Sequence, residues 1–214
     1  MPGIELAGAT LTAIDFETTG SVPGWPNEPW QVGLYRFTLS QPLDAMPVLS
    51  GRRSPLNNAS AEVRGREAPA FFSSPLRIAP DRPFNRFAPG RHALLRHELA
   101  VAPTLPELWE EISPWLVDTP LVAHNIGTER TLLRAAAPLH RLGPWIDTLA
   151  LARALLPGRA SYALEDLVSS LGLTPRVAAL ASGLAPHDAL YDAIACGELL
   201  CALFALGLSF CPCA

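Results

Sequence analysis

The sequence contains no lysine, so all sixteen of its basic residues are arginine. Charged residues of both signs are few, at 17%, whereas apolar residues make up 49% of the 214 residues. This composition excludes an intrinsically disordered chain and indicates a globular protein with a substantial core. The length fits one domain better than two, and we expect a single domain over residues 1–214.

Cysteine is scarce as well, and the four cysteines lie near the C-terminus: Cys196, Cys201, Cys211 and Cys213. The opening stretch MPGIELAGAT has neither the basic start nor the long apolar core of a secretory signal. We therefore expect a reduced, cytoplasmic protein. The Cys-Pro-Cys stretch supplies only two thiols, half of a zinc site, so we favour incidental thiols over metal binding.

The charge is unevenly distributed around a formal net value of −4. Between Arg52 and Arg96 there are nine arginines but only three acidic residues. These arginines fall in a proline-rich stretch without periodicity, which we interpret as an Arg/Pro-rich insertion over about residues 41–101. A stretch of this length is expected to contain a short strand or to serve substrate binding. A basic segment beside an acidic remainder suits an enzyme that holds cations and acts on a polyanion, and a solvated basic loop is the alternative.

Outside this insertion, strand and helix patterns alternate. Strands are expected over residues 9–17, 30–39 and 120–125. Helices are expected over 104–116, 127–139 and 161–173, and a short strand is expected to continue into a helix over 145–156. Thr104 and Ser161 are the expected N-caps of the first and third of these helices. The order of elements predicts an α/β domain with a mixed sheet.

The chain from Pro186 to about Leu208 is predicted to form one long helix, whose second half is apolar on every side. About 18 apolar residues are enough to span a membrane, so a C-terminal membrane anchor is one interpretation. However, Gly197 and Glu198 interrupt the stretch and no basic residues flank it. We therefore favour a helix that is buried in the core.

Acidic residues stand at the ends of predicted strands and at the starts of predicted helices. The stretch DFETTG places Asp15 and Glu17 two residues apart, so both side chains point to the same side of a strand. Like charges held side by side repel each other. Glu129 falls on the first turn of a later helix, and His187 opens the last helix with Asp192 about a turn and a half beyond it. An α/β fold can gather these five residues at one site.

The order and spacing of these residues resemble the DEDDh exonucleases. These are 3′→5′ nucleases of the ribonuclease-H-like fold, and they include the proofreading epsilon subunit of bacterial DNA polymerase III. The motif DFETTG matches the family closely, and the pair His187 and Asp192 matches its third motif in type and spacing. In the middle motif, where the family has an aromatic residue followed by Asp, this chain has Thr128 and Glu129.

The resemblance covers most of the chain outside about residues 41–101, including the supporting stretches IDTLALAR and YALEDLVSSLGL. It implies a mixed sheet with helices on both faces. It also implies two divalent cations, Mg²⁺ or Mn²⁺, which would stabilise the attacking and leaving oxygens of a phosphodiester.

The resemblance further implies a role for each site residue. Asp15 would bridge the two ions, Glu17 and Asp192 would complete one coordination shell, and Glu129 would support the second ion through water. His187 would be the general base that takes a proton from the attacking water.

Four further residues are implied to contact the substrate. Thr18, Thr19 and Gly20 would let backbone and hydroxyl groups approach the terminal nucleotide. Asn125 would brace the site, although capping of the following helix is an equal alternative. We interpret the neighbouring His124 as a hydrogen-bonded core residue.

The leading hypothesis is a metal-dependent 3′→5′ exonuclease that releases nucleoside monophosphates from single-stranded 3′ ends of DNA or RNA. The Arg-rich segment would contact phosphates, and a polymerase or repair protein is the expected partner. The alternative is a weak or inactive nucleic-acid-binding module with the same fold. Because Glu129 is one methylene longer than Asp, and a water-mediated role tolerates that change best, we favour retained activity.

Overall fold

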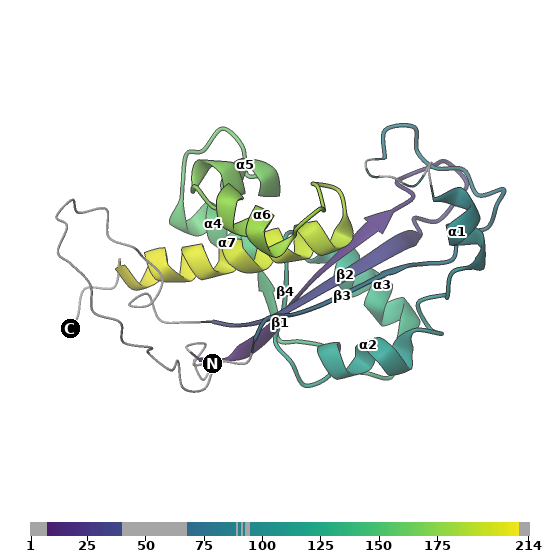
Figure 1. Cartoon of the computed structure of the whole chain (residues 1–214), viewed down its shortest axis with the longest axis horizontal. Coiled ribbons are helices and arrows are strands. Elements are labelled where there is room, and N and C mark those ends of the chain that lie inside the picture. The colour runs from purple at the N-terminus through teal and green to yellow at the C-terminus, as the bar shows by residue number, and fades with distance from the viewer. Residues whose placement is uncertain (1–7, 40–67, 89, 91, 93–94, 210–214) are drawn as a thin grey trace.

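The computed structural model describes residues 8–39, 68–88, 90, 92 and 95–209 (Figure 1). Its strands are β1 (Thr10–Thr18), β2 (Pro29–Thr38), β3 (Ala70–Pro75), β4 (Leu121–Ala123) and β5 (Trp145–Asp147). Its helices are α1 (Arg96–Val101), α2 (Trp109–Leu116), α3 (Gly127–Ala136), α4 (Thr148–Leu155), α5 (Leu164–Ser170), α6 (Thr174–Leu180) and α7 (Ala189–Ser209). Most of the predicted insertion and the Cys-Pro-Cys stretch lie outside the described residues.

The strands form one sheet in the order β3-β2-β1-β4-β5. Antiparallel pairing joins β1 to β2 and β2 to β3, whereas β1 pairs with β4 and β4 with β5 in parallel. The α/β fold with a mixed sheet is therefore confirmed. Strand β3 is the short strand expected within the insertion.

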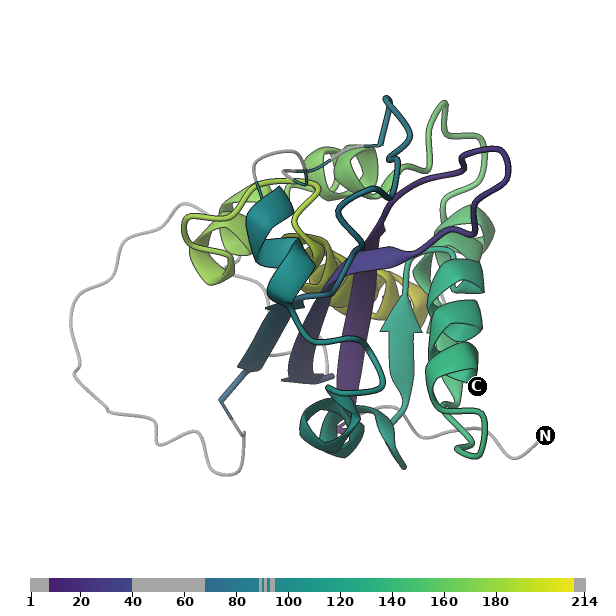
Figure 2. The same cartoon turned by 90° about the vertical axis from the view of Figure 1, so that its right-hand side faces the viewer.

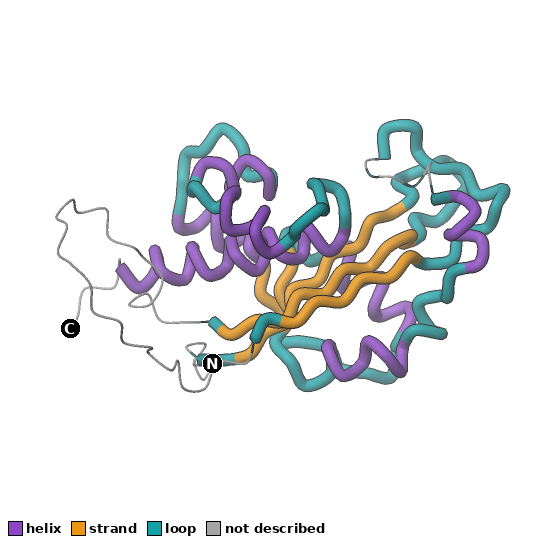
Figure 3. The backbone as a smooth tube through the Cα atoms, viewed as in Figure 1, coloured by secondary structure: helices purple, strands orange, loops and turns teal. Residues whose placement is uncertain are grey.

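The two faces of the sheet carry separate parts of the core. In β1, Ala13 belongs to a buried cluster that includes residues of α7, whereas Ile14 belongs to a cluster with residues of α2 and α3. Figure 3 shows helices on both sides of the orange strands. Because side chains alternate along a strand, Asp15 and Glu17 share the α7 side with Ala13.

Two predicted helix starts are wrong. Thr104 and Glu107 do exchange the predicted capping bonds, from Thr104 N–H to Glu107 Oε2 at 2.7 Å and from Glu107 N–H to Thr104 Oγ1 at 3.4 Å. However, residues 105–108 form a turn that leads directly into α2, and the helix itself begins at Trp109. Helix α5 begins at Leu164, and the hydroxyl of Ser161 accepts a hydrogen bond from Ala163 N–H in the preceding turn instead of capping the helix. The short helices α1 and α6 were not predicted.

Helix α7 runs along the sheet against β1 and β2 (Figure 1). By length and composition it could cross a membrane, but here much of it is buried inside the domain. Gly197, which interrupts the apolar run in the sequence, lies against the ring of Tyr35, and a Cβ there would meet that ring at 2.7 Å. The core-helix interpretation is therefore confirmed.

Candidate active site

The candidate site forms at the edge of the sheet where β1 ends. Because β1 and β4 are parallel, their C-terminal ends meet at the same edge. Asp15 and Glu17 come from the last residues of β1, and Glu129 comes from the first turn of α3, which follows β4. The N-terminal end of α7 supplies Asp192, with His187 just ahead of that helix.

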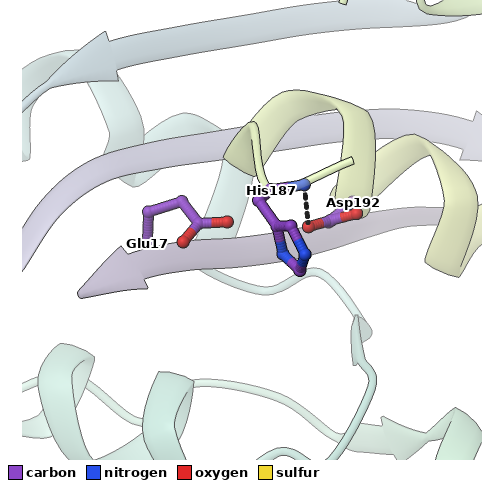
Figure 4. Close-up of side chains that lie close together, drawn as sticks. All are labelled: Glu17, His187 and Asp192. Atoms are coloured by element: carbon purple, nitrogen blue, oxygen red, sulfur yellow. Dashed lines mark hydrogen bonds between the residues drawn. The ribbon is translucent and has the colours of Figure 1, made fainter. Parts of the chain in front are cut away.

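Glu17, His187 and Asp192 converge from positions about 170 residues apart in the sequence. One potential ligand atom from each lies within 4.8 Å of the others. Figure 4 shows the three side chains directed toward one another between β1 and α7. The backbone N–H of His187 donates to Asp192 Oδ2 at 3.1 Å, and His187 itself has a left-handed φ of 66°. Such a conformation is uncommon for a residue other than glycine, and it occurs preferentially at functional sites.

The carboxylates at this edge of the sheet repel one another, and burial makes their charged forms still less favourable. Burial raises the pKa of Asp15, and repulsion by Asp192, Glu129 and Glu17 raises it further. Burial, together with the charge of Asp192, raises the pKa of Glu17 to about 8. Burial also raises the pKa of Asp192 to about 6, although its hydrogen bond from the His187 backbone acts in the opposite direction. Positive charge placed among these groups would relieve both repulsion and desolvation.

Glu129 lies in the first turn of α3, as predicted, with only 5% of its surface exposed. Burial raises its pKa to about 7. Its Oε2 atom is buried and has no hydrogen-bond partner among the described residues. A buried carboxylate oxygen is normally paired, so this atom is suited to an external ligand such as a cation or a cation-bound water.

Gln31 and Gly33, which the sequence analysis did not identify, hold α7 over the site. The Gln31 side chain donates to Asp188 Oδ2 at 3.1 Å and accepts from Ala189 N–H at 3.3 Å. Gln31 is also the residue opposite Glu17 in the β1–β2 pairing. It therefore fixes the start of α7 relative to Glu17. A polar side chain between the apolar residues Trp30 and Val32 was the sequence signal for it.

Glycine at position 33 lets α7 approach the sheet closely. A Cβ on Gly33 would overlap the backbone carbonyl of Ala189 and the amide of Leu190. Gly33 pairs with Asp15 across the β1–β2 ladder. Only glycine therefore allows the first turn of α7 to lie directly over the acidic end of β1.

The predicted substrate-contacting residues divide into two groups. Thr18 is half-buried at the end of β1, and Gly20 has a left-handed φ of 72°. In contrast, the side chain of Thr19 is fully buried, and its Oγ1 accepts hydrogen bonds from Glu28 N–H at 3.1 Å and Arg82 at 3.0 Å. The expectation that the Thr19 hydroxyl approaches a nucleotide is therefore wrong, because this group is used inside the protein.

Asn125 is exposed, with a left-handed φ of 71°, and its backbone N–H donates to Asp147 Oδ1 at 3.1 Å. The N-cap of α3 is Ile126, with no side-chain cap, so the alternative of Asn125 as the helix cap is wrong. His124 lies behind the site, where its ring bonds Thr148 Oγ1 and the Tyr162 carbonyl, both at 2.9 Å. It is the hydrogen-bonded core histidine that was predicted.

The residues present fit a divalent-cation site. Four carboxylates and one imidazole supply the hard oxygen and nitrogen donors that Mg²⁺ and Mn²⁺ accept. No basic side chain is among the causes of the shifted pKa of Asp15 or Glu17, and one oxygen of Glu129 has no partner among the described residues. Cations would supply the missing positive charge.

Solved structures of exonucleases have the same fold as this chain. The chain is similar to a full-length 3′-exonuclease, with a TM-score of 0.61, 15% identity, and coverage of 94% of this chain and 84% of that one. It is also similar to the nuclease domain of 3′hExo, a DEDDh family member bound to rAMP, with a TM-score of 0.59, 14% identity, and coverage of 94% and 92%. Exonuclease I from E. coli with an oligonucleotide gives a TM-score of 0.53 at 15% identity, and covers 94% of this chain and 40% of that one.

Among curated proteins, the chain is similar to the PolC-type DNA polymerase III of Thermotoga maritima, with 29% identity over 171 residues. The match includes 78% of this chain but only 10% of the polymerase, so the chain spans about a tenth of the length of that relative. The sequence model of the exonuclease family matches residues 12–200, which include every predicted site residue. The chain therefore belongs to the exonuclease family, and its fold and motifs place it in the DEDDh group with a ribonuclease-H-like architecture.

Proposed function

We propose that this protein is a metal-dependent 3′→5′ exonuclease that hydrolyses phosphodiester bonds at nucleic-acid 3′ ends and releases nucleoside monophosphates. The observation that carries this proposal is the convergence of Glu17, His187 and Asp192 within 4.8 Å, beside Asp15 and the unpartnered oxygen of Glu129. Family membership agrees with this reaction class.

The carboxylates of Asp15, Glu17 and Asp192 would hold the cations, together with Glu129. When bound, two divalent cations stabilise the attacking and leaving oxygens of the displacement. His187 would accept a proton from the attacking water, because its exposed ring lies next to Glu17 and Asp192 on the open side of the site. The hydrogen bond from its backbone to Asp192 keeps the base and the carboxylate in a fixed relation.

Glu129 would serve the cations in the place of the family's Asp. Its backbone stands in α3, its side chain is buried, and its charge raises the pKa of Asp15. This supports retained activity over an inactive binding module.

We propose single-stranded DNA or RNA 3′ ends as the substrate. Similar structures include a 3′-exonuclease that recognises a histone mRNA stem-loop and an exonuclease I bound to an oligonucleotide. The similarity to PolC-type polymerases supports a polymerase or repair partner, and we propose a role in proofreading or repair. We also propose a cytoplasmic location, on the composition of the sequence alone. We also propose that residues 1–214 form one domain with an insertion at about 41–101.

A direct test uses 5′-labelled single-stranded DNA and RNA with Mg²⁺ or Mn²⁺. We expect a ladder that shortens from the 3′ end, with release of nucleoside monophosphates and complete inhibition by EDTA. Asp15→Asn and His187→Ala are each expected to lower kcat by at least about 10²-fold. Glu110→Gln, an exposed acid on α2, serves as the matched control and should not change the rate.

Salt-sensitive binding without cleavage by folded protein would favour the inactive module instead. Cleavage that is unaffected by Asp15→Asn would contradict the proposed site.

A further inference from the structure

Arg82, in the basic segment, is completely enclosed by the protein. Only 1% of its surface is exposed, although it lies in a segment for which phosphate contacts were predicted. Its Nε atom donates to Glu28 Oε2 at 2.9 Å, and its NH1 group donates to the Pro83 carbonyl at 2.5 Å. Its NH2 group donates to Thr19 Oγ1 at 3.0 Å and to the Pro26 carbonyl. Burial of a guanidinium is unfavourable unless its donors are matched, and here each nitrogen has an acceptor.

Three of these four acceptors lie in the loop of residues 19–28, which joins β1 to β2. Thr19 stands where the loop leaves β1, and Glu28 stands where it enters β2. The two ends are also joined directly, by Thr19 N–H to the Glu28 carbonyl at 2.8 Å and by Glu28 N–H to Thr19 Oγ1 at 3.1 Å. The guanidinium of Arg82 also lies over the ring of Trp25, 5.0 Å from its centroid. Arg82 therefore acts as a brace across the base of the loop.

The segment that carries Arg82 makes further contacts with the same loop. Asn85 N–H donates to the Thr19 carbonyl at 2.8 Å, and the Asn85 side chain donates to the Ser21 carbonyl at 2.8 Å. A Cβ on Gly20 would meet Asn85 Cβ at 2.8 Å, so the two backbones are closely packed. The register of β1 is irregular between Glu17 and Thr18, immediately before this loop. The regular ladder thus ends between Glu17 and Thr18, directly at the base of the loop that Arg82 holds.

We propose that Arg82 is a positioning residue of the exonuclease site: it fixes the loop of residues 19–28 so that Thr18 and Gly20 meet the terminal nucleotide correctly beside the cation ligand Glu17. This inference rests on the proposed exonuclease function. It assigns Arg82 a role that lysine cannot fill, because one ammonium group cannot reach Glu28, Thr19 and Pro26 at once as the planar guanidinium does.

The experiment compares Arg82→Lys and Arg82→Met with Arg159→Met as the matched control. Arg159 lies outside the basic segment, and its side chain donates to the Ser170 hydroxyl. We expect both Arg82 variants to lower kcat/KM by on the order of 10²-fold, because a misplacement of about 1 Å has that effect, whereas Arg159→Met stays near wild type. The lysine variant should give no rescue.

Two further measurements separate positioning from a general structural role. Hydrogen exchange without metal should rise in residues 19–28 of the Arg82 variants while α7 stays protected. In a double-mutant cycle, Thr19→Val should lower kcat/KM, and the Thr19→Val/Arg82→Met protein should lose less than the product of the two single losses, because both changes remove the Arg82–Thr19 contact. Thr19→Val alone tests the same contact if the Arg82 variants do not fold.

Wild-type kcat/KM in Arg82→Lys, or exchange that rises equally throughout the core, would overturn the inference. If the wild-type protein has no nuclease activity, the proposed function fails, but local loosening of residues 19–28 still tests the brace independently.

Discussion

At the scale of single residues, the acidic groups determine how the protein responds to pH. The pKa values of Glu17, Glu129 and Asp192 are raised to about 8, 7 and 6 by burial, and Asp15 is raised as well. The folded protein therefore retains protons that the unfolded chain has released. Each group contributes stability below its unfolded pKa, and this contribution is lost as the pH rises through the folded value.

We expect the metal-free protein to lose stability between about pH 5 and pH 9 through these groups. Glu17→Gln keeps the size of the side chain but removes its charge, so the variant should gain in Tm relative to wild type as the pH rises. At the upper end of this pH range, we expect the Tm of the variant to exceed that of wild type by on the order of 5 °C, given the size of the chain. Thermal unfolding in EDTA measures the difference, and added Mn²⁺ should reduce it. A Tm difference that is independent of pH would contradict the raised pKa of Glu17.

The length of the Glu129 side chain gives a second prediction at this scale. We expect Glu129→Gln to lower kcat by about 10²-fold, because the charge is lost in a site that needs it. Glu129→Asp withdraws the carboxylate by about one C–C bond and should lower kcat by about 10-fold or more. Single-turnover rates with Mg²⁺ and Mn²⁺ distinguish the two variants. An Asp variant faster than wild type would show that Glu129 is a poor substitute at this position.

At the scale of elements, the decisive contact is between β2 and the start of α7. Gln31 and Gly33 lie two residues apart in β2, and both contact the start of α7. Gln31 contacts it through side-chain hydrogen bonds, whereas Gly33, which has no side chain, lets the helix backbone come close to the strand. The helix can carry Asp192 into the site only while this contact is kept.

We therefore expect Gly33→Ala to push α7 away from β1. A methyl group there overlaps backbone atoms, which cannot move aside as a flexible side chain can. The variant should lose more than about 10²-fold in kcat and about 1–3 kcal/mol of stability, the range typical of overpacking. Urea unfolding and the exonuclease assay measure the two effects.

Gly127→Ala is the matched control for this change, because a Cβ at that position meets nothing within 4 Å. It should leave the unfolding free energy unchanged or slightly raised. Equal effects of the two alanine substitutions would contradict the close approach of α7.

At the scale of the whole molecule, a buried acid joins three elements away from the site. Glu198 on α7 is 2% exposed, accepts from the Tyr35 hydroxyl on β2 at 2.8 Å, and pairs with Arg176 on α6. The same acid interrupts the apolar run that made α7 look like a membrane span. Its partners explain why it is tolerated inside the domain.

Glu198→Gln should lower the free energy of unfolding by about 1–3 kcal/mol, because Arg176 loses its carboxylate while Tyr35 keeps a hydrogen-bond acceptor. Since Glu198 makes its hydrogen bond and ion pair with Tyr35 and Arg176 and not with the acidic cluster, kcat/KM at low temperature should stay unchanged. Urea unfolding with activity measured below the transition tests both points. A large fall in kcat/KM without loss of stability would contradict the separation of the two clusters.

Local pattern alone was enough for much of this protein. The strand patterns of residues 9–17 and 30–39 predicted β1 and β2, because such patterns are properties of neighbouring residues. The resemblance of the motifs that hold Asp15, Glu17, His187 and Asp192 implied a DEDDh exonuclease. Helices α1 and α6 escaped prediction, since six or seven residues give too little periodicity to stand out.

Only the tertiary structure decided which residues contact one another when they lie far apart in the chain. It turned Arg82 from an expected phosphate contact into a buried brace, enclosed the Thr19 hydroxyl, and gave Gly33 and Gln31 their contacts with α7. The physical reason is that burial and pairing depend on neighbours from distant segments. The sequence by itself determined which acidic residues and which histidine form the candidate site, and packing determined what holds them in place.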